Sequence, residues 1–310
     1  MPELPEVEVV RLGLAPAVTG ALVTGVDVLD DRALTRHDRA LGEFEDALVG
    51  RRILGTARRG KFLWMPLSLS DRRAAPQARI GAGFDTPASP AARPAALLAH
   101  LGMTGQLLLR TPDAPRAAHL RVRITLEHPE HGEIAVHFVD QRTFGSLAVD
   151  RLVSADSGGE VPTQVAHIAR DPLDALFDDD AVVAALRRKD SAVKRVLLDQ
   201  TVVSGVGNIY ADEALWAARI HPQRIAKTLS ARQARTLLAE VHAVFQRALA
   251  EGGTSFDAQY VNVNGQAGYF ARSLGAYGRT GQPCPRCGTA IVRVAFANRS
   301  SHFCPRCQRL

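Results

Sequence analysis

The sequence predicts an α+β protein with several domains: a β-sandwich or barrel behind a leading helix, then a helical region, then a small zinc-bound hairpin. Three observations support this fold class. From about residue 20 to 150 the pattern is strand-like, with short strand segments separated by turns. Helical periodicity begins near Asp171, and all four cysteines lie between positions 284 and 307. At 310 residues, the chain is long enough for two or three such units.

The N-terminal half begins with a predicted helix at residues 5–14. Pro5 suits the first helical turn, and acidic residues favour the positive end of the helix dipole, which is how we interpret Glu6 and Glu8. The segments that follow have strand character, and they include ALVTGVDVL, KFLWMPL, LRVRITLE and GEIAVHFVD. The stretch at about 68–97 is rich in Ala, Pro, Gly and Arg and has neither period, so we expect a flexible insertion between two strands.

The helical region contains several segments with clear end signals. DDDAVVAALRRK begins with acids and ends with bases, as the helix dipole favours. SAVKRVLLDQ and NIYADEALWAARI are joined by the turn TVVSGVG, an arrangement that is common in DNA-binding motifs and equally common in ordinary helical packing. LSARQARTLLAEVHAVFQRALAEGG predicts a long amphipathic helix ended by glycines. The polar segment at about 257–272 is typical of a mobile loop.

The composition indicates a polyanionic partner and excludes a membrane protein. The net charge is +6 and the pI is about 9.5, and only four of the 38 basic residues are lysines. No apolar run approaches the ~20 residues that span a bilayer. The N-terminus carries acids instead of the basic and apolar pattern of a signal peptide. We therefore expect a cytoplasmic protein.

The cysteines form two pairs, Cys284-Pro-Arg-Cys287 and Cys304-Pro-Arg-Cys307, with 16 residues between the pairs. This spacing is typical of a structural Zn²⁺ site in which four thiolates complete a tetrahedral coordination. Two disulfides are the alternative, but the sequence shows no secretory context that would favour them. The tail from residue 276 to 310 has six Arg and no Lys, Asp or Glu, which suits a hairpin that lies on phosphate groups.

Pro2 directly follows the initiator methionine. Removal of Met1 would give Pro2 a free secondary amine, which can attack an aldehyde-like carbon and form a cationic iminium. An α-amino group titrates near pH ~8 instead of the ~10.4 of a lysine, so it needs less deprotonation. Glu3, beside it, could transfer protons during ring opening and hydrolysis. Because many proteins begin with Met-Pro, this interpretation depends on the rest of the sequence.

Five further residues each have a functional and a structural interpretation. Lys61 enters an apolar strand, where a lysine also discourages edge-strand aggregation. His100 opens the tight turn HLGMTG, and Met103 in that turn suits a wedge that enters a base stack. Arg142 and Phe144 in DQRTFG provide a second apolar wedge with a cation beside it.

Four residues of the C-terminal half are candidates for phosphate binding. Asn208 is expected at the N-cap of a helix whose N–H groups and dipole would receive a phosphate. Lys189 and Lys194 lie on adjoining predicted helices and could hold neighbouring phosphates. Arg299, between the two cysteine pairs, would be held by the hairpin and directed at DNA.

Eight motifs occur in order along the chain: PELPEVE, RRGKF, HLGMTG, DQRTFG, VSGVGNIYADEAL, GGTSF, GYF…YGR and CPRC…NRSSHFCPRC. Nearly end to end, the sequence resembles the bacterial formamidopyrimidine-DNA glycosylases, bifunctional repair enzymes for oxidised purines. The resemblance implies a β-sandwich, a helix–two-turn–helix domain and a zinc finger, with DNA bound between the two halves. The implied boundaries are 2–150 for the catalytic sandwich, 151–170 for a linker, 171–273 with a lesion-capping loop at about 257–272, and 274–310 for the finger.

The same resemblance implies the catalytic roles. Pro2 is the Schiff-base nucleophile that attacks the sugar C1′, and Glu3 is the proton donor to the sugar. Lys61 assists at the damaged nucleotide and its phosphate, and Arg299 acts in the later elimination as well as in phosphate binding. Two successive eliminations then cut the strand on both sides of the lesion.

The DNA contacts are implied in the same way. Phosphate binding falls to His100 and Asn208, in addition to the arginine of the finger. The gap left by the flipped base is filled by Met103, Arg142 and Phe144, with the arginine facing the orphaned cytosine. Looser assignments are Lys189, Lys194 and His119. The implied cofactor is one structural Zn²⁺, and the implied partner is damaged double-stranded DNA, bound by a monomer.

Two alternatives and one departure accompany the resemblance. An endonuclease VIII-like glycosylase for oxidised pyrimidines shares the architecture and the nucleophile, although Leu4 and the PEVE continuation favour the purine enzyme. A catalytically silent lesion sensor would be expected to have lost Pro2, Glu3 or Lys61, which are all present. Thr143 stands where the family often has a basic residue, and we expect that difference to cost little.

Overall fold

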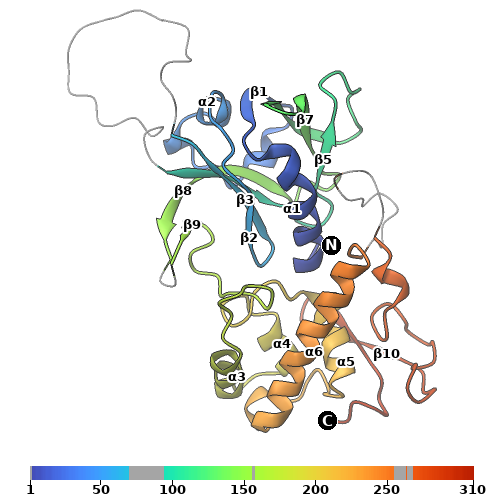
Figure 1. Ribbon diagram of the computed structural model, residues 1–310. Coiled ribbons are helices and arrows are strands. Elements are labelled where there is room, and N and C mark those ends of the chain that lie inside the picture. Colours follow the sequence, from blue (N-terminus) through green and yellow to red (C-terminus); the bar gives the residue numbers. More distant parts are fainter. Residues whose placement is uncertain (1, 70–93, 156–157, 255–262, 264–267) are drawn as a thin grey trace, which may run out of the picture.

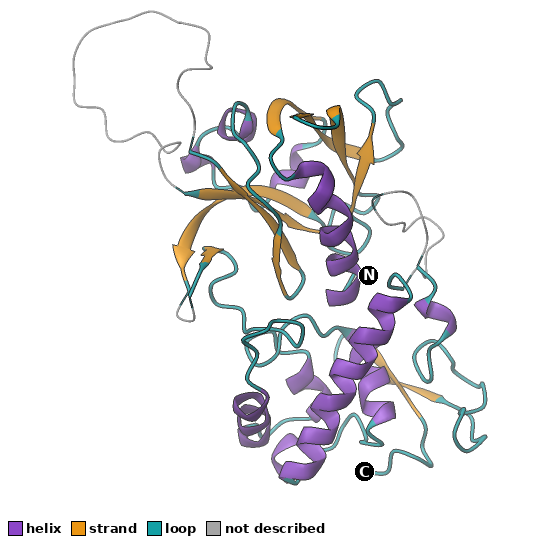
Figure 2. Cartoon of the chain, in the orientation of Figure 1, coloured by secondary structure: helices purple, strands orange, loops and turns teal. Residues whose placement is uncertain are grey.

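The computed structural model describes residues 2–69, 94–155, 158–254, 263 and 268–310. It has two lobes, with the N-terminus between them (Figure 1). The larger sheets lie in one lobe, and the longest helix lies in the other (Figure 2). In the described residues the helices are α1 (Leu4–Val18), α2 (Phe44–Leu48), α3 (Asp179–Arg188), α4 (Val193–Leu197), α5 (Asn208–Ala217) and α6 (Ala231–Ala250), with short 3₁₀ segments η1 (Asp31–Leu34), η2 (Arg39–Leu41), η4 (Ala226–Thr228) and η5 (Phe270–Arg272). The strands are β1 (Leu22–Val28), β2 (Ala57–Arg59), β3 (Phe62–Leu67), β4 (Ala95–His100), β5 (Gln106–Arg110), β6 (Leu120–His128), β7 (Gly132–Val139), β8 (Ser146–Ser154), β9 (Glu160–Pro162), β10 (Val292–Phe296) and β11 (Arg299–Phe303).

The N-terminal lobe is a sandwich of two antiparallel sheets, which confirms the predicted fold class. One sheet has the strand order β1-β6-β7-β5 and the other has the order β2-β3-β4-β8-β9. Alternate residues of β3 point to opposite faces: Leu63 and Met65 enter the core between the sheets, whereas Trp64 packs in a smaller cluster on the outer face. This period of two fixes the register of the strand that follows the turn carrying Lys61.

Helix α1 belongs to both lobes. Leu4, at its start, lies in the hydrophobic core of the helical lobe, whereas Val7, Val10 and Leu14 lie in the core of the sandwich. The backbone N–H of Leu4 also donates to the carbonyl of Gly205 at 3.2 Å, in the turn before α5. The first residues of the chain are therefore held where the two lobes meet.

In the helical lobe, α3, α5 and α6 pack around one hydrophobic core, and strand β11 of the zinc hairpin contacts α5. Ser230 caps α6 by accepting from the N–H of Gln233 at 3.2 Å. Helix α4 is shorter than the segment SAVKRVLLDQ, because Ala192 pairs in a β-bridge with Ile225 before the helix begins. Asn208 is the first residue of α5 instead of its N-cap, which is Gly207.

Three sequence boundaries need correction. The expected insertion at about 68–97 ends too late, because residues 95–97 already belong to β4 and pair with β3 and β8; residues 70–93 lie outside the described residues. Part of the expected linker at 151–170 belongs to the sheet, since β8 and β9 reach into it. Of the expected capping loop at 257–272, residues 257–262 and 264–267 lie outside the described part, and Val263 is buried against the sandwich core. Among the described residues, no helix has the length and apolar character needed to cross a membrane.

Candidate active site and zinc centre

A cavity of about 250 Å³ lies where the two lobes meet, and four of the predicted site residues line it. Pro2 comes from the residues just before α1, Lys61 from the turn between β2 and β3, His100 from the end of β4, and Arg299 from the start of β11. Pro2 and Arg299 are separated by almost the whole length of the chain. The fold therefore brings together a proline, a lysine, an imidazole and a guanidinium around one space large enough for part of a nucleotide.

Glu3 is fully buried next to the N-terminus of α5. Its Oε1 accepts from the N–H of Ile209 at 3.0 Å and its Oε2 from the N–H of Tyr210 at 3.4 Å. Burial raises the pKa of the Glu3 carboxyl above its usual value, whereas the charge of Lys61 and the two backbone hydrogen bonds oppose that rise. The expectation that this helix end receives a phosphate is wrong for these two N–H groups, because the carboxylate of Glu3 occupies them.

The approach of Glu3 requires a residue without a side chain at position 207. A Cβ on Gly207 would lie 2.2 Å from Cδ of Glu3, which is closer than any real contact. The second glycine of the GVGN motif is therefore explained by the close approach of the Glu3 carboxyl group. A carboxyl group with a raised pKa, placed beside Pro2, is more readily protonated than an ordinary glutamate and can therefore serve as a proton donor.

Lys61 lies in a turn that the start of the helical region holds in place. Asp171 accepts from the N–H of Gly60 at 2.9 Å and binds the guanidinium of Arg58 through both oxygens, at 2.8 and 3.1 Å. Arg58 also donates to Glu8 at 2.9 Å, so Glu8 joins α1 to this turn instead of only decorating the helix. Burial lowers the pKa of the Lys61 ammonium, an effect that Glu3 opposes and Arg299 reinforces.

His100 enters the site as a neutral hydrogen-bonding group. Burial, together with the positive charges of Arg36 and Lys61, lowers the pKa of His100 to about 4. The N–H of Gly102 donates to Nδ1 at 3.2 Å, so the ring proton resides on Nε2 in this arrangement. The imidazole can therefore offer one N–H to a phosphate oxygen without adding a positive charge.

Glu6 has a larger role than the sequence indicated. Its side chain is almost completely buried, and Oε1 accepts from the hydroxyl of Tyr210 at 2.5 Å and from the N–H and hydroxyl of Thr254 at 2.7 and 2.8 Å. Its Oε2 accepts from the N–H of Glu3 at 2.8 Å. Glu6 therefore ties Glu3 to α5 and to the loop that follows α6, and its interpretation as helix decoration is wrong.

The proposed wedge residues come from two neighbouring loops. Met103, Arg142 and Phe144 are all exposed, and Nη1 of Arg142 lies 4.0 Å from Sδ of Met103. The buried carboxylate of Asp140 joins the two loops: it accepts from the hydroxyl of Thr104 at 2.5 Å and from the N–H of Gly145 at 2.8 Å. An exposed apolar pair on a rigid base is the form that a base-stack wedge requires.

The loop that carries the wedge contains one strained position. Thr143 has φ +55°, a left-handed backbone conformation that a β-branched residue rarely adopts. Gly102 in the other loop has φ +59°, and a Cβ there would lie 2.4 Å from the backbone of Phe144. A glycine or asparagine adopts this conformation more easily than threonine. The small cost expected for Thr143 in place of a basic residue stays a prediction.

The remaining candidates are spread over the helical lobe and the sandwich. Lys189 is exposed at the end of α3, with its Nζ 3.4 Å from Asp199. His119 is exposed with φ +62°, ahead of β6. Asn208 is partly buried and donates from Nδ2 to the carbonyl of Ser300 at 3.0 Å. Lys194 is completely buried, so the structure does not place its ammonium on a surface that DNA could reach.

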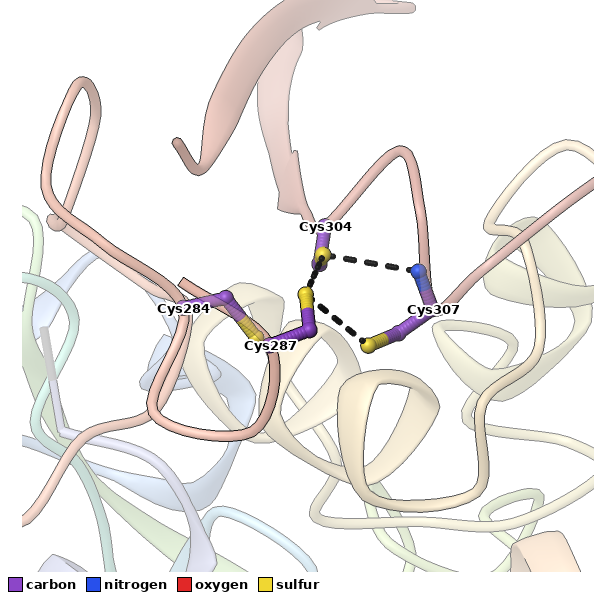
Figure 3. Close-up of side chains that lie close together, drawn as sticks. All are labelled: Cys284, Cys287, Cys304 and Cys307. Carbon is purple, nitrogen blue, oxygen red and sulfur yellow. Dashed lines mark hydrogen bonds between the residues drawn. The ribbon is translucent and has the colours of Figure 1, made fainter. Parts of the chain in front are cut away.

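The four cysteines converge from two loops of the finger, with their sulfur atoms pointing toward one another (Figure 3). All four Sγ atoms lie within 4.8 Å of one another, and Sγ of Cys287 is 3.5 Å from those of Cys304 and Cys307. These separations are too long for a disulfide of ~2.05 Å and match the edges of a tetrahedron with Zn–S bonds of ~2.3 Å. The donor set fits one structural Zn²⁺ and leaves no ligand position for water.

The zinc loops are also supported from α5. The indole Nε1 of Trp216 lies 3.5 Å from Sγ of Cys284, and the guanidinium of Arg286 stacks over the indole ring at 4.0 Å. Glu213 of the same helix accepts backbone N–H groups of Gly275 and Ala276, each at 2.8 Å. The finger is therefore anchored on the helix that also holds Glu3.

Sequence reasoning missed the buried carboxylates that hold these loops. Asp140 is the first residue of the motif DQRTFG, and Asp171 opens the helical region in ARDPL, so both were visible as acids beside functional segments. Nothing in a single sequence distinguishes an acid that accepts buried backbone N–H groups from one in solvent. Their roles depend on contacts between residues that are 5 to 113 positions apart.

Together, an antiparallel sandwich, a helical lobe with a four-cysteine finger, and a cavity containing an N-terminal proline define a two-lobed DNA-repair glycosylase. Family models match all three parts: the formamidopyrimidine-DNA glycosylase N-terminal domain at residues 1–147, the H2TH domain of the same enzymes at 168–259, and the zinc finger found in Fpg and IleRS at 281–310. The chain belongs to the formamidopyrimidine-DNA glycosylase family. It is a base-excision repair glycosylase for oxidised purines, with the AP lyase activity that is typical of the family.

Similar proteins cover the whole chain. The formamidopyrimidine-DNA glycosylase of Leifsonia xyli is 59% identical over 100% of both chains, and that of Nocardioides sp. is 54% identical over 99% of this chain and 94% of its own. The crystal structure of the MutM (Fpg) protein from Thermus thermophilus has a TM-score of 0.77 at 33% identity, covering 99% of this chain and 98% of its own. A Lactococcus lactis Fpg variant in complex with Fapy-dG-containing DNA has a TM-score of 0.78 at 29% identity, covering both chains completely.

Proposed function

We propose that Pro2, Glu3, Lys61 and Arg299 carry out excision and strand cleavage at oxidised purines such as 8-oxoguanine and formamidopyrimidines. The observation that carries this proposal is the shared cavity, which is lined by Pro2, Lys61 and Arg299. Glu3 follows Pro2 in the chain and is held by a hydrogen bond from the N–H of Ile209 at the start of α5. The proposal requires removal of Met1, because only then is the proline nitrogen a free amine.

The chemistry proceeds through a covalent intermediate. The amine of Pro2 attacks C1′, and the glycosidic bond breaks, with its electron pair leaving on the base, which takes up a proton. The ammonium formed on Pro2 loses its N–H proton, and the freed lone pair of the nitrogen then forms the iminium as the C1′–O4′ bond breaks, while Glu3 donates a proton to O4′. The lowered pKa of Lys61 and the positive charge of Arg299 suit groups that transfer a proton or neutralise a phosphate beside this centre.

Strand cleavage follows from the iminium. The cationic nitrogen acidifies the hydrogen on C2′, and loss of that proton expels the 3′ phosphate with the electron pair of the C3′–O bond. A second proton loss, from C4′, expels the 5′ phosphate. Water then hydrolyses the remaining iminium and returns the free amine of Pro2. The zinc takes no part in these steps, because four cysteines fill its coordination.

DNA is held on both sides of this cavity. We propose that His100, Asn208 and Lys189 bind phosphates, with His119 as a further contact of the sandwich. The exposed side chains Met103, Arg142 and Phe144 enter the duplex as the lesion nucleotide rotates out, and the arginine faces the unpaired cytosine. Unstacking costs least at a damaged base, which favours lesions over intact DNA.

The test is borohydride trapping on a duplex with one 8-oxoguanine opposite cytosine. Wild type should give a covalent protein–DNA adduct only with the lesion, and Pro2→Gly should give none while still binding the lesion duplex. A preference for thymine glycol would favour the pyrimidine enzyme instead. Intact-mass measurement that finds Met1 retained on active protein would overturn the nucleophile assignment.

We also propose that the protein acts as a monomer in the bacterial cytoplasm, associated with the nucleoid through DNA. The proposed domain boundaries are the end of β9 for the sandwich and about residue 273 for the helical domain. Size-exclusion chromatography with light scattering tests the oligomeric state, and limited proteolysis tests the boundaries.

A further inference from the structure

A buried ion pair joins the zinc hairpin to the helical lobe, outside the cavity. Nζ of Lys194, in α4, lies 2.6 Å from Oδ1 of Asp212, in α5, and both side chains are completely buried. An ammonium and a carboxylate are stable in such a place only when nearly all their hydrogen-bonding capacity is used. The partners they use therefore indicate what the pair does.

All of the partners outside the pair belong to β11. Nζ of Lys194 donates to the carbonyl of Ser300 at 2.9 Å and to the hydroxyl of Ser301 at 3.0 Å. Oδ1 of Asp212 accepts from the hydroxyl of Ser301 at 3.0 Å, and its Oδ2 accepts from the N–H of His302 at 2.8 Å. Three consecutive residues of the strand are thus held by one ion pair.

The ammonium has no donor left for DNA. A lysine side chain carries three N–H groups, and Asp212, Ser300 and Ser301 accept all three of them. A phosphate could reach Lys194 only after these buried bonds had broken. The lysine therefore differs from Lys189, which is exposed on the same lobe.

The three residues held in this way directly follow Arg299. Arg299 pairs with Phe296 across the tight turn of the hairpin, and Ala297 in that turn has φ +50°. Asn208 adds a second hydrogen bond to the carbonyl of Ser300, at 3.0 Å. The backbone next to Arg299 is therefore fixed from α4 and from α5, while the guanidinium itself is exposed at the cavity.

We propose that Lys194 and Asp212 are positioning residues for Arg299: the pair holds β11 on the helical lobe so that the arginine faces the cavity and a phosphate beside the lesion. The inference rests on the proposed function, in which Arg299 binds that phosphate. Lys194 contributes to DNA binding through the hairpin and makes no contact with DNA.

The test measures how the affinity for a duplex with a tetrahydrofuran abasic analogue depends on salt. The slope of log K against log [salt] is negative, and each lost phosphate contact lowers its magnitude by about 0.9. Arg299→Ala is expected to lower the slope by that amount. Lys194→Met is expected to lower it equally, although the charge it removes is buried, and the double variant should show no further fall. Lys227→Met, which removes an exposed lysine of the same lobe, should keep the wild-type slope.

A second variant separates positioning from folding. Lys194→Met leaves the Asp212 carboxylate buried without its partner, so Lys194→Met/Asp212→Asn removes that charge as well. This double variant is expected to melt close to wild type and retain its zinc, but to keep the reduced slope, because the bonds from the ammonium to β11 are missing. If Lys194→Met alone fails to fold, this variant carries the comparison with Arg299→Ala.

Four outcomes would overturn the inference. A wild-type slope in both Lys194 variants would mean that the pair only stabilises the fold. Additive losses in Lys194→Met/Arg299→Ala would mean that Lys194 meets a phosphate of its own. An equal fall in Lys227→Met would mean that the slope reports net charge alone. A wild-type slope in Arg299→Ala would remove the proposed role of Arg299 itself, a failure distinct from the first three.

Discussion

Two lysines, Lys61 and Lys194, are withdrawn from solvent to different degrees and differ in their hydrogen bonding: Lys61 is partly buried and Lys194 completely buried. Lys194 gives all three of its N–H groups to acceptors in a completely buried network. Lys61 lines the cavity beside Glu3, and among the described residues no hydrogen bond or salt bridge satisfies its ammonium. A buried lysine with a full set of partners stabilises a fold, whereas one with donors directed into a cavity can act on a substrate.

The turns that carry Lys61 and Arg299 are held in the same way. A buried carboxylate, Asp171 for the first and Asp212 for the second, accepts a backbone N–H close to the functional residue and also binds a basic side chain. In both cases the carboxylate and the turn come from distant parts of the sequence. In both cases, the backbone next to a long basic side chain is fixed, and this limits the positions that the charged end of the side chain can take.

The largest effect is expected for Lys61→Met. Removing the ammonium should lower the rate of 8-oxoguanine excision about 10²- to 10⁴-fold, the usual contribution of a general acid–base group. The melting temperature should stay level or rise, because a buried charge without a paired partner is lost. Single-turnover cleavage and thermal melting measure the two quantities. If Lys61→Met melted as far below wild type as Lys194→Met, the distinction between the two lysines would be wrong.

The next effect concerns Asp171. Asp171→Asn should destabilise the protein by about 3 kcal/mol, because the guanidinium of Arg58 stays buried after losing a bidentate partner. Excision should slow as well, since the turn before Lys61 loses its anchor. Asp174→Asn is the matched control: Asp174 pairs with a more exposed arginine, and its loss should cost at most about 1 kcal/mol. Equal destabilisation of both variants in urea would argue against the anchor.

The sandwich and the zinc finger were predictable because their signals are local. Strand-like composition between turns identified β3, β6 and β7, with clear alternation in β6, and the spacing of the cysteine pairs identified the metal centre. The end of the insertion was placed too late because Ala95 and Ala96 belong to a run of small residues, and only pairing with β3 and β8 shows that they are in a strand.

The candidate site was predictable by residue type, but its contacts were not. Pro2, Lys61, His100 and Arg299 were chosen individually from the sequence, and the fold brings them to one cavity. The N-terminus of α5 was assigned to a phosphate because a free helix end attracts anions, whereas the group that accepts its N–H bonds is the carboxyl group of Glu3. Long-range contacts of this kind leave no periodicity in the chain.

The pH dependence of the melting temperature tests the raised pKa of the Glu3 carboxyl group. The raised pKa of Glu3 means that the folded state binds its proton more tightly than the unfolded state. The resulting stabilisation is complete below the ordinary value of 4.5 and is lost as the pH rises through the raised pKa. Glu3→Gln should therefore gain melting temperature relative to wild type between pH 4 and pH 8, while excision slows about 10²-fold. A constant difference in melting temperature across that range would contradict the raised pKa.

The smallest effect is expected for Lys189→Met, the exposed counterpart of the two inner lysines. Its ammonium is 45% exposed and pairs loosely with Asp199 at 3.4 Å, so its loss should change the melting temperature little. If Lys189 binds a phosphate, the slope of log K against log [salt] should fall by about 0.9 and excision at saturating enzyme should be unchanged. Exposure thus separates three proposed roles: we expect Lys189 to act by its charge on DNA, Lys61 by chemistry in the cavity, and Lys194 by holding another cation in place. A Lys189→Met variant that bound DNA normally but excised slowly would break this division, because slow excision with normal affinity is the behaviour expected of Lys61.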